Sequence, residues 1–184
     1  MAILSVNKLL KAELESLDKQ LKTRSRTKVE MINIMSDHII SSGGKRLRPI
    51  TLLLSAYSVN NQLENTIIDS SVVVEFIHAA TLLHDDVVDM SDIRHNIDTA
   101  HTIWGNKGAV LVGDFLYSRA FEIIVEINSP LVYETLAQTT NIIAQGEVMQ
   151  LMNIGNIDIN EKLYMDIIFR KTSILFQASM KIGA

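Results

Sequence analysis

Apolar residues recur at three- and four-residue intervals along much of the chain, which is the pattern of amphipathic helices. Over residues 5–21 the pattern passes through Leu9, Leu10, Leu14, Leu17 and Leu21. A polar patch at residues 22–28 interrupts it, and a second helical stretch follows over residues 29–40. The spacing therefore predicts two helices joined by a polar connection.

Residues that commonly end helices are rare, because the whole chain holds only two prolines and eight glycines. Gly43 and Gly44 are expected to end the second helix, since glycine readily adopts the backbone conformation found after a helix. Pro49 is expected at the start of the next helix, over residues 49–58. The stretch 61–90 is apolar on nearly all sides, which predicts a long central helix.

The second half of the chain continues the helical pattern. Residues 91–106 are polar and are expected to form a loop with a short helix, followed by a helix over 109–126. Three pairs of residues are typical of helix starts. Asn61 with Glu64 is expected to open the central helix, and Ser129 with Pro130 a helix reaching about Met152. Asp158 with Glu161 is expected to open a last helix that runs to the end. We expect an all-α bundle of roughly eight helices with no strand.

Bulk composition excludes several classes of protein. At 184 residues the chain is one domain, residues 1–184, or part of a larger one, and it has no cysteine for a disulfide or a thiolate metal site. A net charge of −4 argues against a general nucleic-acid binder. We find neither a signal-peptide pattern nor a run of about 18 apolar residues for a membrane span, so the expected location is the cytoplasm.

The most informative stretch is the end of the long apolar helix. Asp85 and Asp89 lie four residues apart and so share one helix face, and His78, seven residues before Asp85, lies near that face. Two carboxylates side by side suit a hard divalent cation such as Mg²⁺. The alternatives are an exposed acidic helix end and, for His78, a hydrogen-bonded core histidine.

Basic and polar residues elsewhere are candidates for the same site. Lys45 and Arg48 flank a glycine-rich turn and could grip a phosphate, although a solvated basic loop has the same composition. Arg94, followed by His95, signifies nothing alone. Gln150, Lys171 and Thr172 lie late on apolar helices and could line a cavity, although helix lysines usually face water. Together these residues describe a helical cavity for binding a diphosphate through Mg²⁺.

Five ordered blocks, GGKRLRP, HAATLLHDDVVD, VGDFLYSRAF, GEVMQLMN and KTSILF, make the chain resemble the trans-isoprenyl (polyprenyl) diphosphate synthases over about residues 28–182. The resemblance is greatest to the bacterial octaprenyl type, which makes quinone side chains. It implies an all-α, isoprenoid synthase-type helical bundle. It also implies Mg²⁺-dependent head-to-tail condensation of isopentenyl diphosphate with an allylic diphosphate such as farnesyl diphosphate, in a homodimer.

The resemblance implies a role for each matching residue. Asp85 and Asp89 match metal-binding carboxylates, and Asp86 matches a supporting partner. The residues that match those holding isopentenyl diphosphate are Lys45, Arg48 and His78. Arg94 matches an arginine that contacts the allylic diphosphate. The residues that match those near the leaving group and the allylic cation are Lys171, Thr172 and Gln150.

Product length also has a counterpart in the sequence. In the family, bulky aromatic residues just upstream of the first aspartate block the growing chain. Ala79, Ala80 and Thr81 are small here. The resemblance therefore implies a product longer than farnesyl, probed by an Ala80→Phe change that shortens it.

The chain departs from the family pattern in two places. His95 stands where the family has a second arginine, and histidine donates only in a suitable protonation state or tautomer. No second aspartate-rich motif follows Asp89, and the last helix has no cap. We therefore expect the N-terminal portion of a longer enzyme, truncated before that motif and inactive alone.

Two alternatives remain open. A non-catalytic subunit of a heteromeric prenyl synthase would also lack a second motif, although such subunits tend to lose the first as well. A helical metal phosphohydrolase is suggested by the adjacent pair His84-Asp85. That chemistry needs further histidine ligands on neighbouring helices, and His38, His95 and His101 are not convincingly placed for it.

Overall fold

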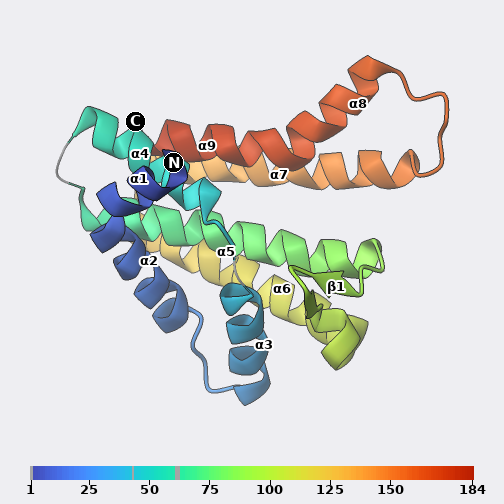
Figure 1. The fold of residues 1–184 in the computed structure, drawn as a ribbon, viewed down its shortest axis with the longest axis horizontal. Coiled ribbons are helices and arrows are strands. Elements are labelled where there is room, and N and C mark those ends of the chain that lie inside the picture. The colour runs from blue at the N-terminus through green and yellow to red at the C-terminus, as the bar shows by residue number, and fades with distance from the viewer. Residues whose placement is uncertain (1, 43, 61–62) are drawn as a thin grey trace.

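A computed structural model describes residues 2–42, 44–60 and 63–184, and these residues fold into a helical bundle (Figure 1). The expected all-α class is confirmed. Two of the residues predicted to mark helix ends and starts, Gly43 and Asn61, lie outside the described residues.

The centre of the bundle is the antiparallel pair α5 (Asn65–Val88) and α6 (Ala100–Ile127), which pack along their length (Figure 1). Five residues in the middle of α5 are completely buried, namely Val72, Val73, Val74, Phe76 and Ile77. Each such side chain contributes roughly 1.5–3 kcal/mol to folding when removed from water. This burial outweighs the weak helix propensity of the valine run.

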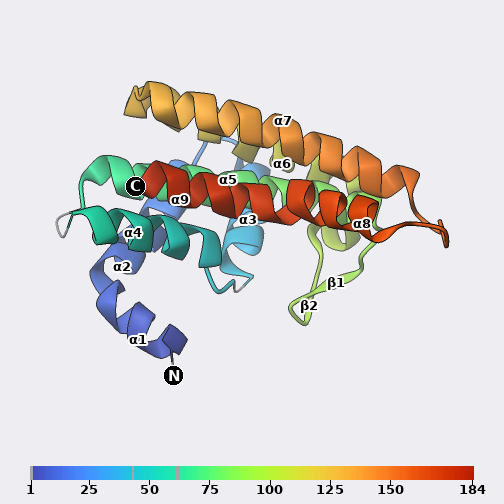
Figure 2. The same cartoon turned by 90° about the horizontal axis from the view of Figure 1, so that it is seen from above.

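The remaining helices surround this pair (Figure 2). Helix α4 (Leu47–Val59) packs against α5 and against α9 (Ile174–Gly183), while α7 (Pro130–Met152) lies along α9 and the π-helical turn η1 (Phe169–Ser173). Helices α2 (Lys11–Arg24) and α3 (Glu30–Ser41) contact α5 and α6. Helix α8 (Glu161–Ile168) joins the loop after α7 to η1 (Figure 1).

The prediction of one helix over residues 5–21 is wrong, because the chain breaks at Leu10 into α1 (Ala2–Leu9) and α2. Leu10 is completely buried and packs with Ile50 and Leu53 of α4. Its contact with a distant helix turns the chain at a point where the local apolar spacing would continue the helix. Helix α2 also runs on to Arg24, where the backbone N–H of Ser25 donates to the Leu21 carbonyl.

Several helix starts differ from the predicted ones. Helix α4 begins at Leu47, two residues before Pro49, after Arg46 in a left-handed conformation with φ 49°. Glu64 occupies the N-cap position of α5 and makes no side-chain capping bond, so the predicted capping box does not form there. Asn160 caps α8 in place of Asp158, with its side-chain oxygen accepting from the Leu163 N–H at 2.9 Å. The predicted span of α7 is confirmed.

The polar stretch after α5 contains a small hairpin, so the prediction of no strand is wrong. Strands β1 (Ile93–Arg94) and β2 (Ile97–Asp98) pair antiparallel, with Ile93 opposite Asp98. His95 and Asn96 form the turn with φ of 50° and 65°, the signs that a type I′ hairpin turn requires. The expected short helix is the first turn of α6, which changes direction at Gly105 with φ 81°.

Among the described helices, α5 alone is long and apolar enough to cross a membrane, with a mean hydropathy of 1.5 over its most apolar window. In the structure 61% of that window is buried inside the protein. This is weak evidence for a membrane span, because the core helix of a bundle meets the same criterion.

Candidate functional site

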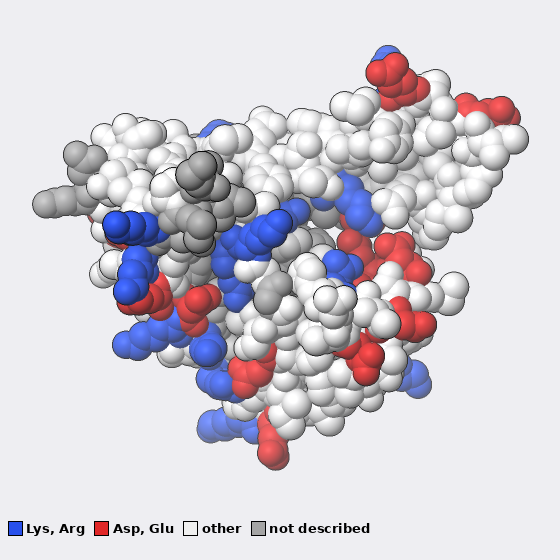
Figure 3. Space-filling view, viewed as in Figure 1, with Lys and Arg blue, Asp and Glu red and all other residues white. Residues whose placement is uncertain are grey.

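Two hollows lie along α5, and each contains some of the predicted site residues. The first measures about 490 Å³ and is lined by residues 44–48 at the start of α4, by Glu75 and His78 of α5 and by His95 of the hairpin. The structure thus brings Lys45, Arg48, His78 and His95 together around one basic space. Figure 3 shows lysine and arginine side chains gathered in the middle of one face, beside a group of acidic ones.

Arg48 and His78 are in direct contact in this basic hollow. The Nη1 of Arg48 lies 3.0 Å from the Nε2 of His78. Burial, together with the charges of Arg48 and Arg94, lowers the pKa of His78 to about 3. The imidazole is therefore neutral near pH 7, and its Nε2 accepts the hydrogen bond from Arg48.

The Arg48 guanidinium has further capacity for a ligand. It stacks on the ring of Phe176, 4.7 Å from the centroid, which holds the group in place by a cation–π contact. Its Nε is buried and has no hydrogen-bond partner within the described part of the chain. A buried donor without an acceptor is costly, and an anion in the hollow would relieve that cost.

Arg46 fixes the basic loop to the core, a role that the sequence did not reveal. Its Nη1 binds Glu75 at 2.5 Å, and its Nη2 donates to the Ile40 carbonyl at 2.6 Å. Glu75 is only 6% exposed, so this pair is largely removed from water. The available signal for it was Glu75 itself, the single acidic residue within the apolar stretch 70–84.

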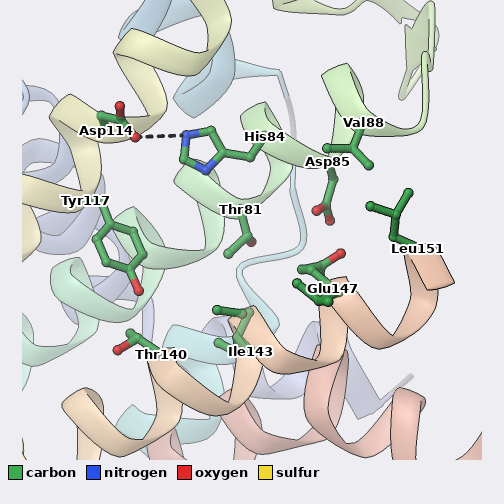
Figure 4. Close-up of a pocket in the computed structure, with 12 residues that line it drawn as sticks. Thr81, His84, Asp85, Val88, Asp114, Tyr117, Thr140, Ile143, Glu147 and Leu151 are labelled. Carbon is green, nitrogen blue, oxygen red and sulfur yellow. Dashed lines mark ion pairs between the residues drawn. The ribbon is translucent and has the colours of Figure 1, made fainter.

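The second hollow, of about 440 Å³, lies between α5, α6 and α7 (Figure 4). Its walls are mainly apolar, and the carboxylates of Asp85 and Glu147 point toward one another across one end (Figure 4). Tyr117 and Thr140 lie toward the other end of the view. The space therefore combines an acidic mouth with a largely apolar interior.

Lys171 lies between the two carboxylates at this mouth. Its Nζ is 2.7 Å from Glu147 Oε2 and 3.4 Å from Asp85 Oδ2. Burial and the neighbouring Glu147 charge raise the pKa of Asp85 to about 6, although Lys171 opposes the rise. Burial alone lowers the pKa of Lys171, but its bond to Glu147 and the surrounding carboxylates outweigh this and raise the pKa.

Local backbone geometry places Lys171 beside Glu147. Lys171 lies in η1, and π-helical turns occur often at functional sites. A Cβ added to Gly146 would lie 2.7 Å from the Arg170 Cβ and 2.9 Å from the Lys171 nitrogen. Only glycine at this position lets η1 approach α7 so closely. Glu147 was missed from the sequence, although it lies within the GEVMQLMN block.

Asp86 and Arg94 form a separate, buried pair. Asp86 is 2% exposed, and the Nε and Nη2 of Arg94 reach its Oδ1 at 3.0 and 2.7 Å. The supporting role that the resemblance implies for Asp86 stays a prediction, and the contact seen here is the one with Arg94. Arg94, expected at a diphosphate, binds this carboxylate and ties the hairpin to α5.

The other predicted residues are placed less centrally. Asp89 is the C-cap residue of α5, with its N–H bound to the Asp85 carbonyl at 2.7 Å. Its charge contributes to the raised pKa of Lys171, so it acts on the same mouth. Gln150 is half-buried and Thr172 is exposed, and neither lines one of the two hollows.

Within the described residues, no group of three or more His, Asp or Glu side chains is close enough to hold a metal ion by itself. His84, considered as a hydrolase ligand, approaches the Val110 carbonyl at 3.2 Å and Asp114 at 3.3 Å. A metal at Asp85 would therefore take further oxygen ligands from water or substrate, as Mg²⁺ commonly does.

Comparisons with known proteins agree with this geometry. The sequence model of the polyprenyl synthetase family matches residues 29–184. Octaprenyl diphosphate synthase of Escherichia coli (strain K12) is 41% identical over 174 residues, covering 95% of this chain and 54% of that protein. Heptaprenyl diphosphate synthase component 2 of Geobacillus stearothermophilus is 31% identical over 184 residues, covering 100% of this chain and 57% of that protein.

A similar solved structure is the polyprenyl synthase of Caulobacter crescentus CB15, complexed with calcium and isoprenyl diphosphate. The two folds superpose with a TM-score of 0.94 at 40% identity, covering 99% of this chain and 55% of that one. The chain spans about half the length of the curated relatives it matches.

Proposed function

Because the chain belongs to the polyprenyl synthetase family, we propose that the protein carrying it is a prenyltransferase. It condenses isopentenyl diphosphate head-to-tail with an allylic diphosphate, releases pyrophosphate and lengthens an all-trans chain. The observation that carries the proposal is the pair of hollows along α5, one basic and one apolar with an acidic mouth. Two charged substrates and one growing apolar chain need these three environments.

The basic hollow suits isopentenyl diphosphate. Lys45 and Arg48 supply positive charge, and Arg48 carries a donor without an acceptor. Neutral His78 orients the Arg48 guanidinium by accepting one of its hydrogen bonds. His95 lines the same space and takes the place of the family's second arginine.

The acidic mouth suits Mg²⁺ with an allylic diphosphate. Asp85 and Asp89 would hold the metal, because carboxylate oxygens are the ligands that Mg²⁺ prefers. The ammonium of Lys171 already lies against Asp85 and Glu147, so the donor set fits a cation. When bound, Mg²⁺ would neutralise charge on the diphosphate and make it a better leaving group.

The chain's own residues then stabilise charge and exclude water. As the allylic C–O bond breaks, Lys171 can hold the departing pyrophosphate, with Thr172 and Gln150 assigned to the same region. The double bond of isopentenyl diphosphate attacks the allylic carbon, and loss of a proton creates the new allylic double bond. The apolar walls of the second hollow keep water from the cation.

The proposed product is a long chain, of the octaprenyl type, grown from farnesyl diphosphate for quinone side chains. Of the three small residues before Asp85, Thr81 lines the apolar hollow, whereas Ala79 and Ala80 are packed in the core. A small side chain at Thr81 leaves that hollow open next to the metal. We also propose a cytoplasmic homodimer.

The test is a product assay on the complete product of the gene that encodes this chain. We expect Mg²⁺, farnesyl diphosphate and labelled isopentenyl diphosphate to give a long prenyl diphosphate, seen by mass spectrometry. Chelation of Mg²⁺ and the Asp85→Ala variant should each abolish it. Absence of product with every allylic diphosphate would favour the non-catalytic subunit instead.

A further inference from the structure

The Lys171 ammonium lies against Asp85, one of the two carboxylates to which the proposed function assigns a divalent cation. It bridges Glu147 of α7 and Asp85 of α5, at 2.7 and 3.4 Å. The three side chains are between 14 and 29% exposed. They therefore interact in a space only partly open to water, where charges act strongly on one another.

The backbone leaves Lys171 close to these carboxylates. Gly146 brings η1 into contact with α7, one residue before Glu147. In Figure 4 the Asp85 and Glu147 carboxylates face one another across the mouth of the hollow. Without a cation between them, two partly buried carboxylates would repel, and the ammonium removes that repulsion.

We propose that Lys171 is the placeholder of the metal site: it occupies Asp85 and Glu147 in the ligand-free protein and leaves them for the diphosphate when a metal–diphosphate complex binds. This inference rests on the proposed function. The positive charges of the ammonium and of a metal ion at Asp85 would repel one another, so the two compete for this carboxylate. The diphosphate supplies new oxygens for the displaced ammonium, so the metal and the diphosphate bind better together than apart.

The proposal makes Lys171 an antagonist of metal binding when diphosphate is absent. This sign distinguishes it from a merely structural residue, whose loss would weaken the metal site. It also differs from a residue that contacts diphosphate only, whose loss would leave the binding of metal alone unchanged. The relevant quantity is the coupling between the two ligands, which must be the same whichever binds first.

The test measures Mn²⁺ binding by equilibrium dialysis, with and without inorganic pyrophosphate. In Lys171→Met we expect Mn²⁺ alone to bind about tenfold more tightly than in the wild type. The gain in Mn²⁺ affinity on adding pyrophosphate should shrink. Lys171→Arg restores the positive charge and should restore weak binding of Mn²⁺ alone. Lys162→Met, which removes an exposed lysine of α8, is the matched control and should leave both values unchanged.

The possible outcomes separate the two proposals. In one outcome the wild-type protein binds Mn²⁺ with pyrophosphate, but Lys171→Met binds Mn²⁺ alone no better than the wild type does. This result overturns the placeholder and leaves the proposed function standing. Wild-type protein that does not bind Mn²⁺ even with pyrophosphate overturns the metal–diphosphate site and the placeholder with it.

A second measurement needs no variant and so does not depend on folding of Lys171→Met. An amine-reactive reagent is applied to the wild-type protein, and modification of each lysine is followed by mass spectrometry. Saturating Mg²⁺ alone should displace Lys171 from the carboxylates and speed its modification several-fold. Lys162 should react at an unchanged rate. An unchanged or slower rate at Lys171 would contradict the proposal.

Discussion

Arg94 donates two hydrogen bonds to Oδ1 of Asp86, from Nε at 3.0 Å and from Nη2 at 2.7 Å. Asp86 is almost fully buried at 2% exposure, whereas the Arg94 side chain is 28% exposed. The pair joins the β1–β2 hairpin to the end of α5, next to Asp85. The arginine expected to meet a substrate thus has a partner within the protein itself.

Loss of this partner should destabilise the protein. Arg94→Ala leaves a buried carboxylate without its cation, which should lower the free energy of unfolding by about 3 kcal/mol. Chemical denaturation measures the change. Arg119→Ala is the matched control, because Arg119 is equally exposed but pairs with exposed Glu122, and its loss should cost less than about 1 kcal/mol. Equal losses in the two variants would contradict the argument.

Asp85 should make stability depend on pH. Its pKa in the folded protein is raised from 3.8 to about 6, so ionisation costs stability as the pH rises from about 4 to above 6. Asp85→Asn should therefore be more stable than wild type at pH 7.5, by about 1–2 kcal/mol after solvent screening. The difference should vanish near pH 4. Thermal unfolding measures the stability of both proteins across this pH range, and a difference that stays constant with pH would refute the prediction.

Arg48 should act on one substrate more than on the other. Arg48→Ala removes the central cation of the basic hollow, so the KM for isopentenyl diphosphate should rise about thirtyfold, equivalent to about 2 kcal/mol. The KM for the allylic diphosphate should change much less. Steady-state kinetics on the complete gene product measure both. Lys107→Ala, on the exposed side of α6, is the control, and equal effects on both substrates would argue against separate binding sites.

Thr81 should control product length. A bulky Thr81→Phe side chain would project into the apolar hollow beside Ile143 and shorten the product by one or more isoprene units. Thr81→Ser should leave the length unchanged. Ala80→Phe is a less direct test, because Ala80 is completely buried in the core, where overpacking typically costs about 1–3 kcal/mol. Mass spectrometry of the products gives the answer, and identical lengths in all variants would rule out Thr81.

Much of the fold was accessible from the sequence, because the long helices depend on signals that are local. Ser129 and Pro130 open α7 where predicted, and the apolar run of α5 is buried as expected. The break at Leu10 was not accessible, since it depends on packing against α4, which is distant in sequence. The hairpin had one local signal, Asn96, a residue type that tolerates positive φ in turns.

The candidate site was only partly accessible for the same reason. Asp85 stood out because an acidic pair at the end of an apolar helix is unusual. Glu147 did not, because a single glutamate on a helix is ordinary until the structure places Lys171 against it. The π-helical turn that carries Lys171 has no sequence pattern of its own, and the small size of Gly146 explains the close approach only once η1 is seen beside α7.

The shared helix α5 also sets the distance between the basic hollow and the acidic mouth. His78 and Asp85 are seven residues apart on one uninterrupted helix, which sets an axial offset of about 10 Å between the two hollows. The helix is continuous between these residues, so the spacing of the basic hollow and the acidic mouth is fixed by backbone hydrogen bonds. One inserted residue would rotate the acidic mouth by about 100° relative to the basic hollow. A substitution along this segment therefore keeps the two hollows in register, whereas an insertion or deletion would not.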